Sequence, residues 1–473
     1  MYQYHSHYIN GQWQDANSAQ TIAVINPANG EQIAVVAAAD NNDIDSAIAA
    51  AKAALPSWSN SSASMRAELI NQIADKMQAR LAELTDVISQ SMGCPRHFAE
   101  QVQVQSAIDA FRSFADLTHV VATQEMVNGT IHAYSPIGVC VLINPWNYPL
   151  SQLVGKLGPA LAAGCTVVVK PAEQTPIQDL LLADIFTEVA APRGIFNVIT
   201  GVGNDIGAYL CAHPDVSMVS FTGSTAAGVK VAEAAAGSVK RVCQELGGKS
   251  PYIITEDADL AAAVKYGVQD VMFNSGQTCC ALTRMLVHES RYEEAVSLAK
   301  QVAEANVIGS PNDPDTTMGP LSSKLQQQRV RDYINRGIAE GARLVTGGID
   351  LPESLSEGAY VLPTIFADVE NHMAIAREEI FGPVLCIMSY KDIQQAVAIA
   401  NDTEYGLSSG VYAKDTESAV NIGRQIQAGQ CYVQGSYFNS DAPFGGFKQS
   451  GNGREWGMEG LREYLEVQAV ITQ

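Results

Sequence analysis

Four short apolar runs, separated by helix-length segments, constrain the fold of this 473-residue chain more than any other feature. They are rich in β-branched residues and cover Val139 to Ile143, Thr166 to Val169, Phe196 to Ile199 and Met218 to Phe221. This alternation is typical of a parallel sheet with helices on both faces, because parallel strands need crossover connections. A second αβ stretch runs from about Asp257 to Tyr412. We therefore expect an α/β protein with two Rossmann-like αβα lobes.

The segment before this alternation is expected to be scaffold. Asn10-Gly11 and Asn29-Gly30, each flanked by β-forming residues, predict two hairpins. Apolar residues at helical spacing between Ile44 and Leu55 predict a helix that ends at Pro56. A second helix is predicted by a single stripe, which comprises Leu69, Ile73, Met77, Leu81 and Leu84.

Charge and cysteine usage narrow the class of function. The chain has 29 Lys and Arg against 50 Asp and Glu, a net charge of −21. This balance argues against nucleic acid or an anionic membrane as partner, because both require a basic face. No signal peptide is apparent, and the apolar runs are shorter than the ~20 residues that span a bilayer. The nine cysteines include no CxxC pair, so we expect no metal site, no disulfide framework and a cytoplasmic location.

Two glycine-rich motifs are weak evidence for nucleotide binding. Gly201-Val-Gly-Asn-Asp-Ile-Gly207 resembles the dinucleotide fingerprint, but it has one residue too many and follows the third strand rather than the first. Gly247-Gly-Lys-Ser250 resembles the end of a P-loop, but Cys243 stands where the first glycine is required.

Cys279 is the strongest candidate for chemistry. It follows a Gly-Gln turn at the end of a predicted helix, where a thiol can project into a cleft. A nucleophilic thiol needs a base or positive electrostatics. Glu245 lies in an apolar, glycine-rich segment that would raise its pKa towards neutrality, so it is a candidate base. Asn147 offers an amide donor for a developing oxyanion. The alternatives are a small buried cysteine, a solvated surface glutamate and a turn asparagine.

Seven motifs, in order along the chain, resemble the aldehyde dehydrogenase superfamily. They are Pro145-Trp-Asn-Tyr-Pro149, Val169-Lys-Pro-Ala-Glu173, Phe221-Thr-Gly-Ser-Thr225, Glu245-Leu-Gly-Gly-Lys249, Gly276-Gln-Thr-Cys279, Glu378-Glu-Ile-Phe-Gly-Pro383 and Pro443-Phe-Gly-Gly446. The resemblance covers essentially the whole chain. Ser450 to Gly457 and Thr283 to Val287 are most similar to a bacterial subgroup that includes oxo-fatty-acid semialdehyde dehydrogenases.

The resemblance implies Cys279 as nucleophile, Glu245 as general base and Asn147 as oxyanion donor. It places Lys170 and Glu173 at the adenosine ribose. A carboxylate there favours NAD, because it repels the 2′-phosphate of NADP, although the nearby lysine leaves NADP use open. Gly223 and Ser224 would lie at the pyrophosphate. The remaining cofactor contacts that it implies are Trp146, Phe221, Leu246, Glu379 and Phe381.

The resemblance also implies a substrate tunnel and a domain order. Tyr148, Tyr437 and Phe438 would line a tunnel for an apolar or aromatic aldehyde, although Val433-Gln434 departs from the Val-Asn that the family often has. Residues 1–116 and 136–246 would bind NAD, and residues 247–445 would form the catalytic domain. Residues 117–135 and 446–473 would be bridging and oligomerisation segments, forming a small β flap that makes a homodimer or homotetramer.

The expected function is NAD-dependent oxidation of an aldehyde to its acid, through a thioester on Cys279 that water activated by Glu245 hydrolyses. A CoA-acylating aldehyde dehydrogenase is the first alternative, which the presence of Glu245 disfavours. A non-catalytic scaffold protein is the second. The combination of Cys279, Glu245 and Asn147 argues against it.

Overall fold

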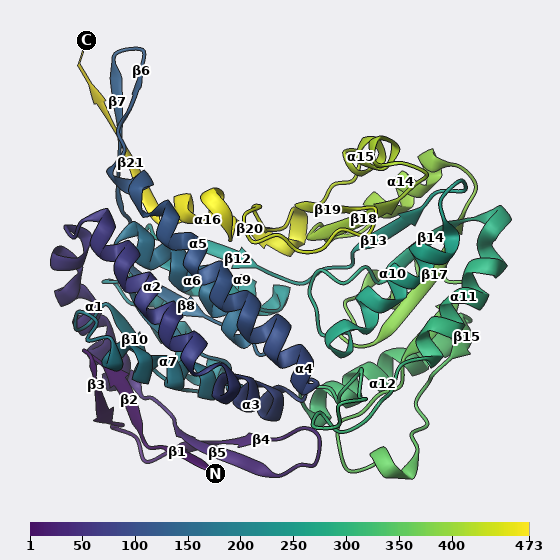
Figure 1. Ribbon diagram of the computed structural model, residues 1–473, viewed down its shortest axis with the longest axis horizontal. Helices are drawn as coiled ribbons and strands as arrows, with labels where there is room; N and C mark the ends of the chain where they lie inside the picture. The colour runs from purple at the N-terminus through teal and green to yellow at the C-terminus, as the bar shows by residue number, and fades with distance from the viewer. Residues whose placement is uncertain (473) are drawn as a thin grey trace.

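The computed structural model describes residues 1–472, which form two lobes and a projecting arm (Figure 1). The first lobe is built on an eight-stranded sheet of order β20-β12-β11-β8-β9-β10-β2-β3. Its strands are β2 Ser6–Ile9, β3 Gln12–Asp15, β8 Val139–Ile143, β9 Thr166–Lys170, β10 Phe196–Val198, β11 Met218–Thr222, β12 Arg241–Glu245 and β20 Gly451–Asn452. The five middle strands are parallel, and β2, β3 and β20 are antiparallel edges. The parallel arrangement predicted for the four apolar runs is confirmed.

Helices cover both faces of this sheet, so its central strands β8, β9, β10 and β11 are buried throughout. Along β8, Val139, Val141 and Ile143 pack with α1 and α8, whereas Cys140 and Leu142 pack with α5, α6 and α7 on the other face. The helices of this lobe are α1 Asn41–Ser59, α2 Ala63–Ala79, α3 Leu81–Met92, α4 Arg96–Phe98, α5 Ser106–Leu117, α6 Pro149–Ala163, α7 Ile177–Glu188, α8 Gly203–Ala212, α9 Thr225–Ala235 and α16 Gly457–Glu463.

The second lobe has a seven-stranded sheet of order β15-β16-β17-β14-β13-β18-β19, parallel except for β15. Its strands are β13 Pro251–Ile254, β14 Arg284–His288, β15 Arg343–Thr346, β16 Thr364–Ala367, β17 Val384–Tyr390, β18 Ser408–Tyr412 and β19 Gln430–Val433. Its helices are α10 Leu260–Met272, α11 Tyr292–Glu304, α12 Lys324–Ala339, α13 Ala374–Arg377, α14 Ile393–Asn401 and α15 Thr416–Gly423.

Two predictions about the N-terminal helices are wrong. The first helix does not end at Pro56 but continues to Ser59, because a proline so close to the C-terminal end interrupts little of the hydrogen-bond ladder. The stripe from Leu69 to Leu84 belongs to two helices, which meet at Arg80. Arg80 has φ −105° and ψ 19°, outside the helical range. The spacing of apolar residues indicates which side chains face the core, but it does not reveal a one-residue break in the helix.

The two predicted hairpins are confirmed. Asn10-Gly11 joins β2 to β3, and the segment containing Asn29-Gly30 joins β4 (Thr21–Ile25) to β5 (Gln32–Ala37). Strand β5 also pairs with β1 (Tyr2–Tyr4), which completes a small sheet of order β1-β5-β4.

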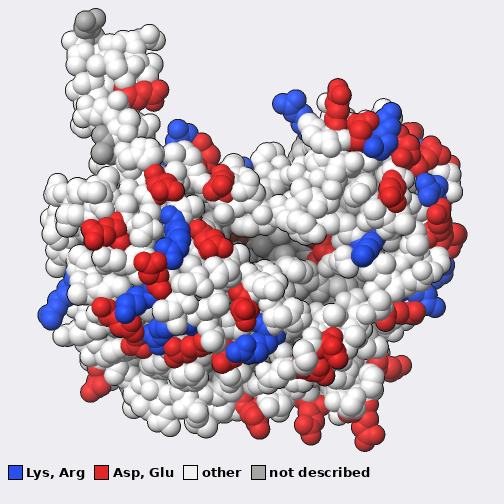
Figure 2. Space-filling model, viewed as in Figure 1, with Lys and Arg blue, Asp and Glu red and all other residues white. Residues whose placement is uncertain are grey.

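The projecting arm joins distant parts of the chain. It is a sheet of order β21-β7-β6, in which β6 is Glu125–Val127, β7 is Thr130–Pro136 and β21 is Leu465–Ile471. Strand β21 lies antiparallel to β7, with Leu465 opposite Pro136 and Ile471 opposite Thr130. The arm stands clear of both lobes in Figure 1 and carries few charged side chains on the face in Figure 2. Within residues 1–472, no helix is both long and apolar enough to cross a membrane.

Arg284 on β14 ties together three segments of the second lobe. Its side chain is fully buried and donates to the backbone carbonyls of Lys249 (3.0 Å), Ile399 (3.0 Å) and Ala400 (2.9 Å). Burial lowers the pKa of this guanidinium to about 10. These carbonyls take the place of the water that the buried charge has lost.

We expect Arg284→Lys to destabilise the second lobe by about 3 kcal/mol, because lysine cannot reach all three carbonyls and would leave buried acceptors unpaired. Denaturant unfolding measures the change, with Arg424→Lys at an exposed position as the matched control. Equal stability of the two variants would contradict this role.

Candidate active site

A left-handed turn places Cys279 at the cleft between the lobes. Three consecutive residues after α10 have positive φ: Asn274 (53°), Ser275 (55°) and Gly276 (73°). Non-glycine residues adopt this conformation only under strain. A side chain at Gly276 would overlap the carbonyl group of Gly382, so glycine is required there. The turn lies between α10 and Cys279, and Figure 2 shows a hollow between the two lobes.

Side-chain amides hold this turn against Asn147, which follows β8 in the first lobe and is only 3% exposed. Asn274 Nδ2 donates to the carbonyl of Asn147 (3.0 Å) and to that of Gln277 (3.3 Å). Asn147 Nδ2 in turn donates to the carbonyl of Gln277 (2.9 Å). The Gln277 side chain bonds to Asn274 O and to Ser322 N, at 3.1 and 2.8 Å. The two lobes therefore meet in one amide network, two residues from Cys279.

The thiol of Cys279 is half-buried, and its pKa is raised well above the ordinary value. The largest cause is interaction with the side chain of Cys280, followed by burial and by the negative charges of Glu379 and Glu245. The surrounding groups favour the neutral thiol.

Glu245 ends β12 and is 3% exposed, and neither of its carboxylate oxygens has a hydrogen-bond partner. Burial raises its pKa well above the ordinary value, and nearby Glu455 adds to the shift, whereas Lys156 and Arg454 oppose it. A buried carboxyl group without a partner is suited to exchange a proton with water or with a thiol.

Sequence reasoning missed a buried ion pair beside this carboxylate. Lys156 Nζ lies 2.8 Å from Glu455 Oε1, with both side chains almost fully buried, and also donates to Thr222 Oγ1 at 2.6 Å. The available signal was a lysine within the apolar sequence of α6. Its partner lies about 300 residues away in the chain and could not be identified by spacing.

The residues predicted at the adenosine ribose come together at the carboxyl end of β9. Lys170 Nζ lies 3.3 Å from Glu173 Oε1, and the backbone N–H of Gly203 donates to the same oxygen. Lys170 is 3% exposed, and burial lowers its pKa, whereas the Glu173 side chain remains 28% exposed. The accessible group at this strand end is therefore the carboxylate.

The start of α9 has the features of an anion-binding helix terminus. Ser224 caps the helix by accepting from Ala227 N at 3.3 Å, and Gly223 precedes it. The N–H of Gly223 already donates to the carbonyl of Glu245 (3.0 Å), so this glycine would contribute close approach rather than a donor. A Cβ atom there would lie 2.6 Å from the ring of Phe221. Leu246 is buried and approaches α9 at Gly228.

Glu379, Phe381 and Trp146 meet where the two lobes face each other. Glu379 Oε1 accepts from Gly248 N at 3.0 Å, and burial raises the pKa of this carboxyl. Phe381 has a φ of 60°, and its ring packs edge-on against Trp146 with centroids 5.3 Å apart. The two lobes thus each contribute to the predicted nicotinamide site.

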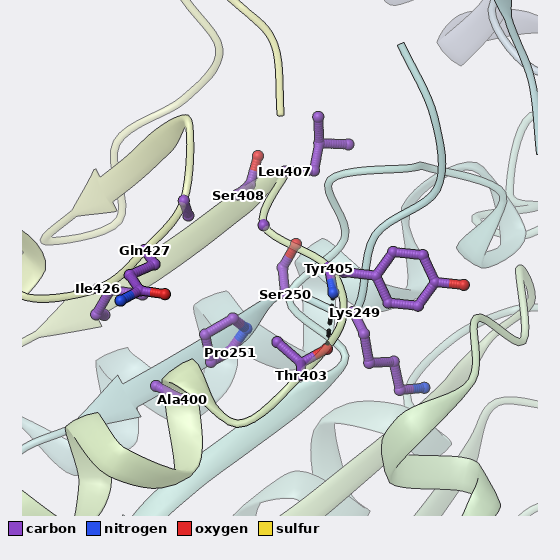
Figure 3. Close-up of a pocket in the computed structure, with 12 residues that line it drawn as sticks. Lys249, Ser250, Pro251, Ala400, Thr403, Tyr405, Leu407, Ser408, Ile426 and Gln427 are labelled. Carbon is purple, nitrogen blue, oxygen red and sulfur yellow. Dashed lines mark hydrogen bonds between the residues drawn. The ribbon is translucent and has the colours of Figure 1, made fainter. Parts of the chain in front are cut away.

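Lys249, inside the second lobe, influences the ionisation of Glu379 through its positive charge. It is 1% exposed and lines a small cavity with Ser250 and Thr403, from which its side chain extends away (Figure 3). Burial lowers the pKa of its amine to about 8. Its charge acts on Glu379 in the direction that favours the carboxylate.

The three predicted tunnel residues occupy different surroundings. The Tyr148 hydroxyl lies 2.7 Å from Thr278 Oγ1, beside the Cys279 loop. Tyr437 is 84% exposed and packs on Tyr266, with centroids 6.3 Å apart. Phe438 packs against Trp456 at 5.6 Å. Only Tyr148 is thus linked directly to the thiol loop.

The Val433-Gln434 departure has a local explanation. Gln434 has a φ of 54°, and its side-chain amide pairs with both backbone groups of Ala413, at 2.8 and 2.9 Å. These bonds tie the loop to the end of β18.

Among residues 1–472, no three His, Cys, Asp or Glu side chains form a group that could hold a metal ion.

Comparison with known proteins places this arrangement in a family. The sequence profile described as the aldehyde dehydrogenase family matches residues 13–470. A 3-succinoylsemialdehyde-pyridine dehydrogenase from a Pseudomonas species is 45% identical over 472 residues, covering 100% of this chain and 99% of that protein.

Two solved structures are similar over nearly their full lengths. A mutant aldehyde dehydrogenase C from Pseudomonas syringae, complexed with NAD+ and octanal, has a TM-score of 0.96 and 46% identity, covering 98% of this chain and 96% of that one. A Mycobacterium tuberculosis aldehyde dehydrogenase complexed with NAD+ has a TM-score of 0.97 and 40% identity, covering 100% and 98%.

The influence of Cys280 on the pKa of Cys279 predicts how Cys279 ionises without cofactor. Because its pKa is raised, alkylation of Cys279 by iodoacetamide should be slow at neutral pH and should accelerate with pH through the alkaline range. Cys280→Ala removes the largest cause of the shift, so the acceleration should move to lower pH. Peptide mass spectrometry measures the rate at Cys279. Superimposable pH profiles for wild type and variant would contradict the influence of Cys280 on the thiol.

Proposed function

Because the chain belongs to the aldehyde dehydrogenase family and is an NAD-dependent oxidoreductase acting on aldehydes, we propose that Cys279 is its nucleophile. In this proposal Asn147 stabilises the oxyanion and Glu245 activates the hydrolytic water. The observation that carries it is the amide network, which fixes Asn147 Nδ2 at 2.9 Å from the carbonyl of Gln277, two residues before the thiol. Glu245, buried without a partner, supplies the base.

The groups at the carboxyl ends of the first sheet fit NAD. The accessible carboxylate of Glu173 suits ribose hydroxyls and disfavours a 2′-phosphate. The N-terminal end of α9, with Gly223 and Ser224, suits the pyrophosphate. Glu379 and Phe381 would contact the nicotinamide ribose and ring, and Trp146, Phe221 and Leu246 would complete the walls. When bound, NAD accepts the hydride that leaves the substrate carbon. The proposed domains are residues 1–116 with 136–246 for NAD and residues 247–445 for catalysis.

The first half of the reaction forms a carbon–sulfur bond. The Cys279 thiolate attacks the aldehyde carbon, and the carbonyl electron pair moves to oxygen. Asn147 Nδ2 donates one hydrogen bond to the carbonyl of Gln277, so its second N–H hydrogen is available to the oxyanion. Loss of hydride from this thiohemiacetal leaves a thioester on Cys279.

The second half releases the acid. Glu245 takes a proton from water, the resulting hydroxide attacks the thioester carbonyl, and the carbon–sulfur bond breaks to return the Cys279 thiolate. The high pKa that burial gives Glu245 makes it a stronger base than an exposed carboxylate. Acyl transfer to coenzyme A needs no such base, so the buried Glu245 favours the hydrolytic reaction.

We propose an apolar or aromatic aldehyde as the substrate. Aromatic rings line the approach to the thiol loop, where Phe98 packs against Phe273 at 4.6 Å and against Tyr148 at 6.4 Å. The similar Pseudomonas syringae enzyme was solved with octanal. The subgroup resemblance to semialdehyde dehydrogenases is consistent with the Pseudomonas relative.

Free cysteines at all nine positions suit a cytoplasmic location.

Glu245→Gln separates hydrolysis from the chemistry before it. Steady-state NADH production with octanal should fall by roughly 10²–10⁴-fold, the usual contribution of a general base. Because no proton moves in hydride transfer, thiolate that still forms should give one burst of NADH, with acyl mass added to the Cys279 peptide. Wild-type turnover that requires added coenzyme A would show that the hydrolytic assignment is wrong.

Glu173→Gln tests the ribose assignment. Loss of the carboxylate removes repulsion of the 2′-phosphate, so kcat/KM for NADP relative to NAD should rise by roughly tenfold. Glu188→Gln, at a partly exposed position on α7, is the control. An unchanged ratio would mean that Glu173 does not contact the ribose.

We also propose that the arm mediates self-association. Met126, Val467 and Ile471 are 62, 60 and 74% exposed on its strands, and an open sheet edge beside apolar side chains favours pairing with another chain. Light scattering at micromolar concentration should give two or four times 50.4 kDa, and Val467→Lys with Ile471→Lys should lower it. A wild-type mass of one chain would refute the proposal.

A further inference from the structure

The backbone of Asn147 is held by two buried amides from opposite sides of the cleft. Gln103 Nε2 donates to the carbonyl of Asn147 at 2.9 Å, and Asn274 Nδ2 donates to the same oxygen at 3.0 Å. The side chain of Asn147 is bonded separately, to the carbonyl of Gln277. Both ends of the residue are therefore fixed, and the first lobe supplies one of its two backbone anchors through Gln103.

Gln103 lies in an unusual stretch of helix. Residues Ala99–Gln105 form a π-helix between α4 and α5, and Ser106 N donates to the carbonyl of Gln101, five residues earlier. Short π-helical segments often occur at functional sites. Within this segment Gln103 is fully buried, whereas Gln101 is exposed. The π-helix thus carries one glutamine into the protein and leaves another in solvent.

The side-chain amide of Gln103 forms hydrogen bonds through its N–H group and not through its oxygen. Its Oε1 is buried without a partner, and its Nε2 also faces Met92 Sδ at 3.4 Å. Because Asn147 O can only accept, the Nε2 must point towards it, which fixes the orientation of the amide. An apolar side chain of similar size would avoid the unpaired oxygen. The donated bond to Asn147 is therefore the interaction that this amide provides.

We propose that Gln103 is a positioning residue, which acts through Asn147 to align the oxyanion-stabilising amide. The inference rests on the proposed function. When the Cys279 thiolate attacks, a carbon–sulfur bond forms and the carbonyl pair becomes an alkoxide, which needs the free hydrogen of Asn147 Nδ2. Without Gln103, only Asn274 donates to the carbonyl of Asn147, and the backbone of Asn147 is held less tightly. The alkoxide then meets a misaligned donor.

The test compares two reactions of the same thiol. Aldehyde oxidation passes through an alkoxide, whereas iodoacetamide alkylation forms a carbon–sulfur bond with loss of iodide and makes no oxyanion. For Gln103→Met, kcat/KM for octanal should fall by roughly tenfold or more. The alkylation rate of Cys279 and the affinity for NAD should change by less than about threefold, since neither uses the oxyanion donor. Gln101→Met, the same change on the exposed side of the π-helix, should match wild type.

Gln103→Leu also removes the amide donor, and it should show the same split if the methionine variant does not fold. Equal losses in oxidation and alkylation would identify Gln103 as merely structural and overturn the proposal. Unchanged oxidation, or an equal loss in Gln101→Met, would also overturn it. Failure of wild type to oxidise octanal, or alkylation that inactivates the enzyme at another cysteine, would instead contradict the proposed function.

Discussion

The left-handed turn at Asn274, Ser275 and Gly276 is the constraint on which the site depends. Non-glycine residues in this conformation are disfavoured by about 1–3 kcal/mol each, so the turn needs bonds from outside itself. Asn274 donates to Asn147 in the first lobe, and Ser275 Oγ donates to the carbonyl of Gly319 at 2.9 Å. Because one of these anchors belongs to the other lobe, the position of the proposed nucleophile Cys279 depends on the packing of the two lobes. Domain packing and assembly of the site are therefore one event.

Electrostatics then determines the resting state of the site. The two proposed catalytic groups, the Cys279 thiol and the Glu245 carboxyl, both have raised pKa values because neighbouring side chains and burial disfavour negative charge. Lys156 opposes this effect at Glu245, but its charge is shared with Glu455 at 2.8 Å. These surroundings therefore favour the protonated form of both groups. A thiol held neutral in this way reacts slowly with adventitious electrophiles.

The sequence predicts the parts of this protein that depend on local patterns. The buried strands around Val141 and the arm strand beginning at Leu465 follow from β-branched runs, and the residues that meet in the cleft follow from short motifs. The buried pair of Lys156 and Glu455 was not predicted, because the two residues lie about 300 positions apart in the chain. Gln103 was missed, because a π-helix leaves no local signal and its partner lies 44 residues away. The features of the site that were not predicted depend on contacts between irregular segments that lie far apart in the sequence.

The most direct test of the account is the rate of NADH formation by Cys279→Ala beside Cys280→Ala, with NAD affinity measured for both. In the proposed mechanism, all covalent chemistry occurs at the first thiol, and the second thiol has only an electrostatic influence. Cys279→Ala should therefore bind NAD normally and form no NADH from octanal, whereas Cys280→Ala should still turn over. Substantial NADH formation by Cys279→Ala, or equal losses in both variants, would contradict it.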